Sequence, residues 1–166
     1  AHFRIRRLEP AEALHSKDGS IKYRFVLEDG RSIESVLMEH ADHHTVCVSS
    51  QVGCAMGCDF CQTAKMGLVR NLTPGEIVMQ VLAARCDLPD GGNLRNIVFM
   101  GMGEPLANYD NTLNSIRTLT DEQGLHLSAR HITVSTVGLV PPILKLADED
   151  QPINLAVSLH APDNVT

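Results

Sequence analysis

From Thr45 onward, short apolar runs typical of strands alternate with runs typical of helices, and this alternation constrains the fold more than any other feature of the sequence. The strand-like runs cover residues 45–49, 96–100, 131–135 and 153–158. Strands that alternate with helices form right-handed βαβ units, which place the strands side by side in a parallel sheet. The sequence therefore predicts an α/β fold with about four parallel strands, as part of a barrel or of an open wound sheet.

Helices are expected between these strands. Thr73 is followed by Pro74 and then by Glu76, an arrangement that predicts a capping box with proline in the first helical turn. Apolar residues at helical spacing follow it. Two further helices are expected at about 111–119 and 143–147.

The amino-terminal part of the chain has a different pattern. Strand-like runs at 22–27 and 31–38 flank an Asp29-Gly30 pair, and Asp-Gly between two such runs is a strong signal for a β-hairpin. The residues ahead of these runs are polar and mixed in charge, which is typical of a solvated linker. We therefore divide the chain into a linker and hairpin at 1–44 and a core domain at 45–166.

Composition limits the functional classes. A chain of 166 residues that is 43% hydrophobic can bury one core. No apolar run approaches the roughly 18 residues that a membrane helix needs, so we expect a cytoplasmic protein without a membrane partner. The net charge of −6 argues against a dedicated nucleic-acid-binding module, but it leaves room for an enzyme that contacts RNA through a local patch.

Each predicted parallel strand ends in chemically useful residues. The first is followed by a cysteine-rich loop and the second by Gly101-Met-Gly-Glu-Pro105. The third ends in Ser135 and Thr136, and the fourth ends in Ser158-Leu-His160. Because parallel sheets bind ligands at the carboxyl ends of their strands, four such ends at one edge indicate an active site there.

The cysteine-rich loop carries three of the five cysteines, Cys54, Cys58 and Cys61. Three thiolates spaced so closely favour one soft metal centre. An iron–sulfur cluster held by three cysteines keeps one iron open for another ligand, as catalytic metal sites do. Three alternatives stay open: a structural zinc site, which wants a fourth ligand; disulfides, which suit small secreted chains; and a thioredoxin-like pair of Cys58 and Cys61, which leaves the third cysteine unexplained.

These motifs resemble those of the radical S-adenosylmethionine enzymes, in which a Cys-x-x-x-Cys-x-x-Cys loop follows the first strand and a Gly-Glu-Pro turn follows the second. Three longer strings, at 47–54, 101–106 and 158–162, are similar to the RlmN type of this family, the rRNA and tRNA adenine C2 methyltransferases. The resemblance runs from about Lys22 to the end of the chain. The related Cfr enzymes methylate C8 and tend to have alanine where this chain has Pro105, which favours C2.

The resemblance implies a partial radical-SAM (β/α) barrel and a particular chemistry. Members of the family bind a [4Fe-4S] cluster and S-adenosylmethionine, and with an electron from an external flavodoxin or ferredoxin they make a 5′-deoxyadenosyl radical. This radical removes a hydrogen from a methyl group carried on a protein cysteine. The resulting methylene radical adds to C2 of an adenosine in 23S rRNA or, next to the anticodon, in tRNA.

Carried onto this sequence, the resemblance assigns the cluster to Cys54, Cys58 and Cys61. It assigns contacts with the methionine end of S-adenosylmethionine to Gly103 and Glu104, although the glycines of this segment alone suggest no more than a tight turn. Further contacts with the same cofactor are implied for four residues at strand ends: Ser135, Ser158, Leu159 and His160.

Two residues receive catalytic roles from the resemblance alone. Cys47 stands at the place of the thiol that releases the product by forming a disulfide with the methyl-carrying cysteine; the sequence by itself suggests a small buried apolar residue. Glu34 stands at the place of the base that removes the C2 proton, whereas by itself it is an exposed strand residue. Cys86, near a helix end, matches no motif and is expected to be structural.

Parts of the family pattern have no counterpart in the sequence. They are the methyl-carrying cysteine, an asparagine that binds the cofactor, the last strands of the barrel and an N-terminal helical domain. We therefore expect a central fragment that is inactive alone. Within the fold, the alternatives are a C8 methyltransferase or another radical S-adenosylmethionine enzyme; outside it, they are a structural zinc-binding module or a non-catalytic cluster-binding module.

Overall fold

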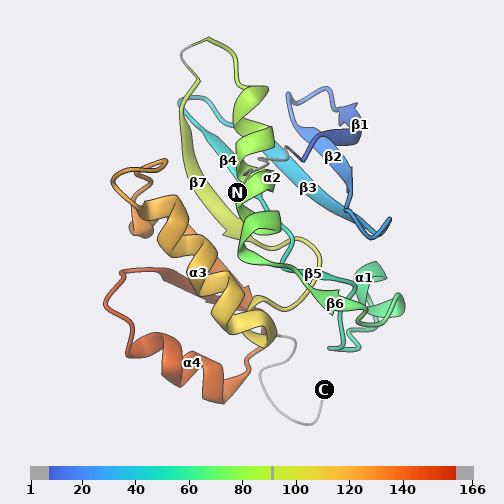
Figure 1. The fold of residues 1–166 in the computed structure, drawn as a ribbon, viewed down its shortest axis with the longest axis vertical. Coiled ribbons are helices and arrows are strands. Elements are labelled where there is room, and N and C mark those ends of the chain that lie inside the picture. Colours follow the sequence, from blue (N-terminus) through green and yellow to red (C-terminus); the bar gives the residue numbers. More distant parts are fainter. Residues whose placement is uncertain (1–7, 91, 160–166) are drawn as a thin grey trace, which may run out of the picture.

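A seven-stranded sheet is the main element of the computed structural model, which describes residues 8–90 and 92–159 (Figure 1). Its strands lie in the order β1-β2-β3-β4-β7-β8-β9. They are β1 (Pro10–His15), β2 (Ile21–Val26), β3 (Ser32–Glu39), β4 (His44–Cys47), β7 (Leu94–Phe99), β8 (Ile132–Thr136) and β9 (Asn154–Val157).

The remaining elements of the described residues are two short strands and six helical segments. The short strands, β5 (Gln51–Val52) and β6 (Arg70–Asn71), pair only with each other. The helices are α1 (Gln62–Lys65), α2 (Pro74–Cys86), α3 (Tyr109–Thr120), α4 (Val140–Ala147) and two 3-10 turns, η1 (Pro105–Asn108) and η2 (Ala129–His131). None of the helices in the described part of the chain is long and apolar enough to cross a membrane.

The sheet has an antiparallel half and a parallel half. Strands β1 to β4 pair antiparallel, whereas β4, β7, β8 and β9 pair parallel. The four parallel strands and the helices between them confirm the predicted α/β fold. The predicted hairpin is β2–β3, and because β3 also pairs with β4, the hairpin belongs to the same sheet as the core strands.

Strand β1 was not predicted, because its segment was expected to belong to a linker. All its residues, Pro10–His15, are exposed, so no apolar alternation marks it in the sequence. Its pairing with β2 along the edge of the sheet defines it instead. The helix boundaries also differ from the expectation, since α3 begins at Tyr109 and α4 at Val140.

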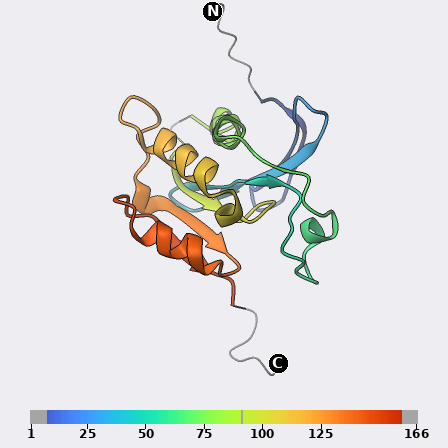
Figure 2. The ribbon, with the colours of Figure 1, turned by 60° about the horizontal axis from the view of Figure 1, so that its bottom comes forward.

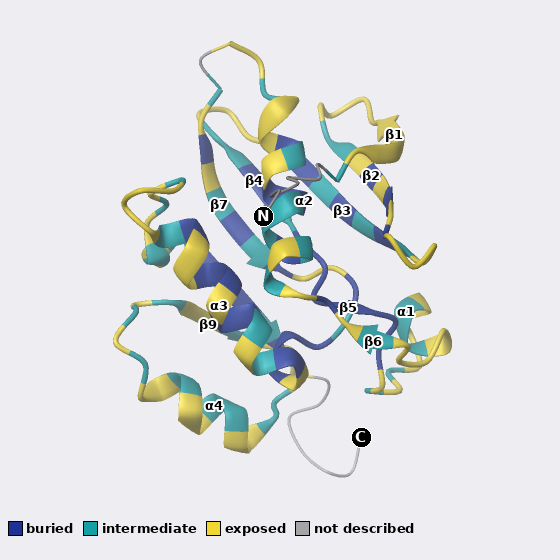
Figure 3. Cartoon of the chain, in the orientation of Figure 1, coloured by how far each residue is buried: buried dark blue, intermediate teal, exposed yellow. Residues whose placement is uncertain are grey.

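The core lies between the sheet and the helices on one of its faces. Buried residues alternate along β2 and β3 and are dark blue in Figure 3. Tyr23, Phe25 and Ile33 belong to the same hydrophobic cluster as Ile77 and Val81 of α2. Helix α3 packs beside α2, and Leu146 of α4 packs against the same core (Figures 1 and 2). In the described part of the chain, no helix covers the opposite face of the sheet.

Candidate active site

The cysteine loop leaves the body of the protein between β5 and β6, which pair at its base. In the neck of the loop, the backbone N–H of Cys54 donates a hydrogen bond to the carbonyl oxygen of Gly67 at 3.1 Å. Gly53 has a φ of 75°, and a Cβ atom there would collide with the same carbonyl oxygen. Glycine at 53 therefore serves both the backbone conformation and the close approach of the two sides of the loop.

The loop carries the three thiols that the sequence singles out. Cys54 is buried, Cys58 and Cys61 are half-buried, and none of the five cysteines of the chain forms a disulfide. Burial raises the pKa of the Cys54 thiol, and the negative charges that Cys61 and Cys58 can carry raise this pKa further. Backbone N–H groups at the start of α1, chiefly that of Ala64, lower the pKa of the Cys61 thiol.

Three soft donors in one loop fit the ligand set of an iron–sulfur cluster with one open iron. Across residues 8–90 and 92–159, no three His, Cys, Asp or Glu side chains already converge in the arrangement of a metal site. The fold thus supplies the thiols and closes the neck of the loop, and we expect metal binding to complete the approach of the three sulfurs.

The turn after β7 lies directly against the start of the cysteine loop. The backbone N–H groups of Ser50 and Gln51 donate hydrogen bonds to the carbonyl oxygen of Met102, at 2.8 and 3.1 Å. Gly103 has a φ of 100°, and a Cβ atom there would lie 2.5 Å from the Cβ of Gln51. The tight turn expected from the glycines is therefore present, and Gly103 leaves room for the backbone of β5.

Glu104 is buried, with only 3% of the residue exposed. Its Oε1 accepts a hydrogen bond from the backbone N–H of Leu106 at 3.0 Å, and its Oε2 accepts one from the N–H of Val137 at 2.9 Å. Glu104 therefore ties the turn after β7 to the loop after β8. Within the described residues no cationic side chain pairs with it, and its charge contributes to the raised pKa of Cys54.

A buried amide of α2 holds the backbone between β4 and β5. The Oε1 of Gln80 accepts a hydrogen bond from the N–H of Ser49 at 2.8 Å, and its Nε2 donates to the carbonyl of Ser49 at 3.0 Å. The hydroxyl of Ser49 donates to the carbonyl of Glu34 at 2.5 Å and accepts from the N–H of Met102 at 2.9 Å. Sequence reasoning missed Gln80, although a glutamine among the apolar residues of a helix is a signal that could have found it.

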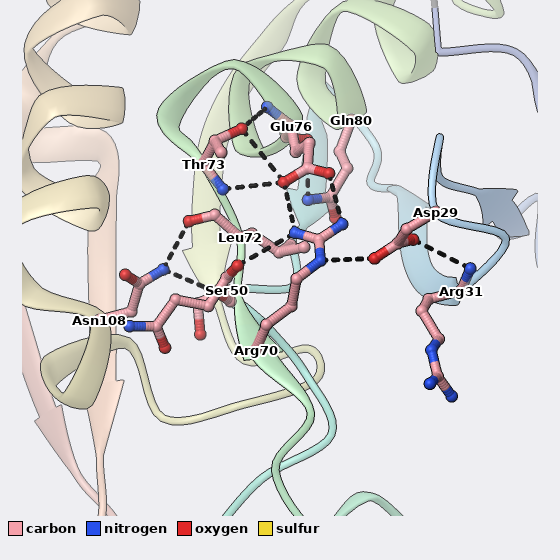
Figure 4. Close-up of polar contacts among 10 residues, drawn as sticks. Asp29, Arg31, Ser50, Arg70, Leu72, Thr73, Glu76, Gln80 and Asn108 are labelled. Carbon is pink, nitrogen blue, oxygen red and sulfur yellow. Dashed lines mark hydrogen bonds and ion pairs between the residues drawn. The ribbon is translucent and has the colours of Figure 1, made fainter.

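A second amide, that of Asn108, fastens the base of the cysteine loop. Its Nδ2 donates to the carbonyls of Ser50 and Leu72, at 2.8 and 2.9 Å (Figure 4). Next to it, the side chain of Gln51 accepts from the N–H of Glu104 at 2.8 Å and donates to Asn71 at 2.7 Å. Neutral amides therefore connect both ends of the loop to the turn after β7.

Arg70 closes the outer side of this base. Its Nε donates to Asp29 in the β2–β3 turn at 2.7 Å, and its two terminal nitrogens donate to the two oxygens of Glu76, at 2.9 and 2.8 Å (Figure 4). Glu76 also completes the predicted capping box with Thr73, which starts α2. Hydrogen bonding to Arg70 lowers the pKa of Asp29. Burial works to raise the pKa of Glu76, but the hydrogen bonds from Arg70 and Thr73 outweigh it and the pKa is lowered.

Glu34 and Cys47 lie on the uncovered face of the sheet. Cys47 is opposite Val36 in the β3–β4 register, which places Glu34 two residues further along the same face of β3. The Glu34 carboxylate accepts from the ammonium of Lys22 at 2.8 Å, and both side chains are about half exposed. Cys47 is only partly buried, less than the sequence alone suggested, and burial raises the pKa of its thiol.

The ends of β8 and β9 bring two more of the expected residues together. The hydroxyl oxygens of Ser135 and Ser158 are 3.5 Å apart. Leu159 is 78% exposed, and His160 lies outside the described residues. Cys86 is exposed at the carboxyl end of α2, so it does not fill a place in the core.

Taken with the strand topology, these contacts place the cysteine loop, the turn after β7 and the ends of β8 and β9 at one edge of the sheet. A family model described as the radical SAM superfamily matches residues 48–166. The chain belongs to the radical SAM superfamily. Membership implies a [4Fe-4S] cluster and S-adenosylmethionine as cofactors in general.

Relatives of known name and structure support the same conclusion. The dual-specificity RNA methyltransferase RlmN of Desulfosudis oleivorans is 56% identical over 165 residues, which are 99% of this chain and 44% of the relative. RlmN 1 of Myxococcus xanthus is 52% identical over 161 residues, 96% of this chain and 45% of the relative. A crystal structure of a radical SAM methyltransferase from Sphaerobacter thermophilus matches with a TM-score of 0.90 and 54% identity, over 94% of this chain and 46% of that chain. The resemblance inferred from the motifs is confirmed, and the chain spans less than half the length of these relatives.

Proposed function

We propose that the chain belongs to a radical SAM methyltransferase that methylates C2 of adenosine in 23S rRNA and in tRNA. The observation that supports this best is the buried carboxylate of Glu104. It has no cationic partner among the described residues, and it lies near enough to Cys54 to influence the pKa of that thiol. A buried charge without a counter-ion is costly, and the ammonium of S-adenosylmethionine would supply the missing positive charge.

The cofactor-binding residues have separate tasks in this proposal. Cys54, Cys58 and Cys61 would hold the [4Fe-4S] cluster. Once bound, the cluster and S-adenosylmethionine supply the electron transfer and the radical that activate the methyl group. Gly103 and Glu104 would bind the methionine end of S-adenosylmethionine, with the carboxylate kept in place by the two backbone N–H groups that it already accepts from.

The strand ends would complete the same site. The adjacent hydroxyls of Ser135 and Ser158 offer polar contacts for the rest of S-adenosylmethionine. Leu159 and His160 follow in the sequence and would extend that wall. An external donor of the flavodoxin or ferredoxin type would supply the electron, and we place the protein in the cytoplasm, without a membrane partner.

The two residues on the uncovered face would act on the RNA. The half-exposed carboxylate of Glu34 would accept the C2 proton of the adenine after the carbon–carbon bond has formed. Once the adduct has lost one electron, the thiolate of Cys47 would attack the sulfur of the methyl-carrying cysteine. A disulfide forms, the bond between that sulfur and the carbon joined to the RNA breaks, and this carbon takes up a proton to become the methyl group. Both side chains lie on the face that the helices leave open to a large substrate.

Metal binding tests the first part of this proposal. Purified without oxygen and supplied with iron and sulfide, the chain should bind about four irons, and S-adenosylmethionine should change the EPR spectrum of the reduced cluster. Cys58→Ala should lose the iron, whereas Cys86→Ala, a matched control at an exposed site, should keep it. Stoichiometric zinc without iron uptake would support a structural zinc module instead.

The catalytic assignments are tested in a full-length enzyme that carries these residues. Cys47→Ala should leave protein covalently joined to RNA, because addition proceeds but release by the thiol does not. Glu34→Gln should also slow release from the adduct and spare iron binding. Normal turnover of the Cys47→Ala enzyme without crosslinked RNA would contradict the assignment, and 8-methyladenosine in the nucleosides would identify the C8 reaction.

A further inference from the structure

A cavity of about 510 Å³ lies on the uncovered face of the sheet. Its lining residues come from β3, β4, β7, β8 and β9, from the turns at the amino ends of β4 and β8, and from Met100, which follows β7. One of them is Val98, whose partner in the β4–β7 register is Cys47. Neighbouring strands lie about 4.8 Å apart, so the cavity begins directly beside the thiol that we propose as the resolving group.

Half of the polar side chains that line this cavity are basic. No carboxylate is among its lining residues. The four basic residues that line it are His40, His43, Arg130 and His131. Within the described residues, the guanidinium of Arg130 makes no ion pair and is exposed. With histidine counted as neutral, Arg130 supplies the one formal charge among these lining residues, whereas the whole chain has a net charge of −6.

The hydrogen bonds of the two turn histidines do not suit a metal site. The Nε2 of His40 is 3.1 Å from the hydroxyl of Thr45, and the Nδ1 of His43 is 2.7 Å from Asp42. The two imidazole rings stack with centroids 4.6 Å apart. Asp42, which precedes His43 in the chain, is thus engaged by His43 and lies 3.8 Å from Arg95. The lining therefore favours an anion.

We infer that this cavity binds a backbone phosphate of the RNA substrate, next to the nucleotide whose base reaches Cys47. The guanidinium of Arg130 and the imidazole N–H groups are donors suited to phosphate oxygens. Asn154 supports Arg130 by donating a hydrogen bond to its backbone carbonyl at 2.6 Å. Contacts of this kind fix the position of a nucleic acid without reading its sequence. The inference rests on the proposed function for the identity of the substrate.

The test measures binding of a fluorescently labelled single-stranded RNA to the chain by anisotropy at several salt concentrations. Arg130→Ala should weaken binding about fivefold at low salt and should reduce the slope of log K against log salt by about one. Arg130→Lys should restore the slope, because it keeps the charge. Arg117→Ala is the matched control, since Arg117 lies on α3 and pairs with Glu149 at 2.9 Å, away from this face.

The inference fails if the unaltered chain binds no RNA. Where the chain does bind RNA, three results would overturn the inference. The first is an Arg130→Ala chain that binds RNA as the unaltered chain does. The second is displacement of the RNA by inorganic phosphate when both supply the same concentration of phosphate groups, because this would identify a site for free anions. The third is a polyglutamate peptide that binds as tightly and depends on Arg130 equally, which would identify an acidic protein partner. Iron and S-adenosylmethionine binding at the cysteine loop test the proposed function separately.

Discussion

Two glycines of the cysteine loop should differ sharply in their tolerance of alanine. Gly53 and Gly57 both have positive φ, 75° and 69°. A left-handed backbone conformation costs an alanine roughly 1–2 kcal/mol. Around Gly57 no atom lies within 4 Å of the position that a Cβ would take, so this conformational cost is the whole effect there. We expect Gly57→Ala to lower the free energy of unfolding by about 1 kcal/mol.

Gly53→Ala carries the same conformational cost and a steric one. Its Cβ would overlap the carbonyl oxygen of Gly67, which accepts the hydrogen bond from the N–H of Cys54. Moving that carbonyl away leaves a donor of a buried residue unpaired, at a further cost of about 1–3 kcal/mol. We expect a total loss of about 3 kcal/mol, and the difference of about 2 kcal/mol between the two variants is about thirtyfold in the unfolding equilibrium constant.

Urea unfolding of the reduced, metal-free chain, followed by circular dichroism, measures both losses under the same conditions. The metal-free form is required because a bound cluster would add its own binding free energy to the stability. If Gly53→Ala destabilises the chain no more than Gly57→Ala does, the closed neck does not contribute to stability as the structure indicates.

Three further predictions concern the surroundings of the loop. The pKa values of Asp29 and Glu76 are lowered in the folded chain. The stabilisation that these carboxylates contribute is therefore complete above their pKa values in the unfolded chain, near pH 4, and is lost as the pH falls through their pKa values in the folded chain. Arg70→Met should flatten this pH dependence, measured as the urea concentration at the unfolding midpoint. Gln80→Ala should cost about 3 kcal/mol in urea unfolding, because it leaves both the N–H and the carbonyl of Ser49 without a partner, and a loss below about 1 kcal/mol would contradict that account. The chain incubated anaerobically with RNA, reductant and S-adenosylmethionine should yield no 2-methyladenosine by mass spectrometry above a control without protein.

The main lines of the fold could be predicted because they leave a periodic signal in the sequence. Strands β4, β7, β8 and β9 are apolar runs, and the Asp29-Gly30 pair marks the hairpin turn. The capping box of Thr73 and Glu76 fixed the start of α2. Strand β1 gave no such signal, because pairing along one edge of β2 is a property of the backbone and needs no apolar side chain.

The candidate site was predictable to a different extent for each of its parts. The spacing of the three cysteines is local, so the sequence shows it directly. The anchoring amides act over long separations: Gln80 bonds Ser49, 31 residues away, and Asn108 bonds Ser50, 58 residues away. Their partners are main-chain groups, which every residue has, so no residue type at the other end of the contact reveals the pairing.

The use of neutral amides under the loop has a consequence for the conditions in which the site keeps its shape. Hydrogen bonds between an uncharged amide and the main chain involve no titrating group and no net charge that dissolved ions can screen. The contacts of Gln80 and Asn108 are buried, whereas the ion pairs of Arg70 lie at a partly exposed rim. Rising ionic strength or falling pH therefore weakens the ion pairs of Arg70 first, while the hydrogen bonds of Gln80 and Asn108 beneath the cysteine loop stay intact. The polar contacts beneath the cysteine loop are therefore insensitive to salt and pH, whereas those at its outer side respond to both.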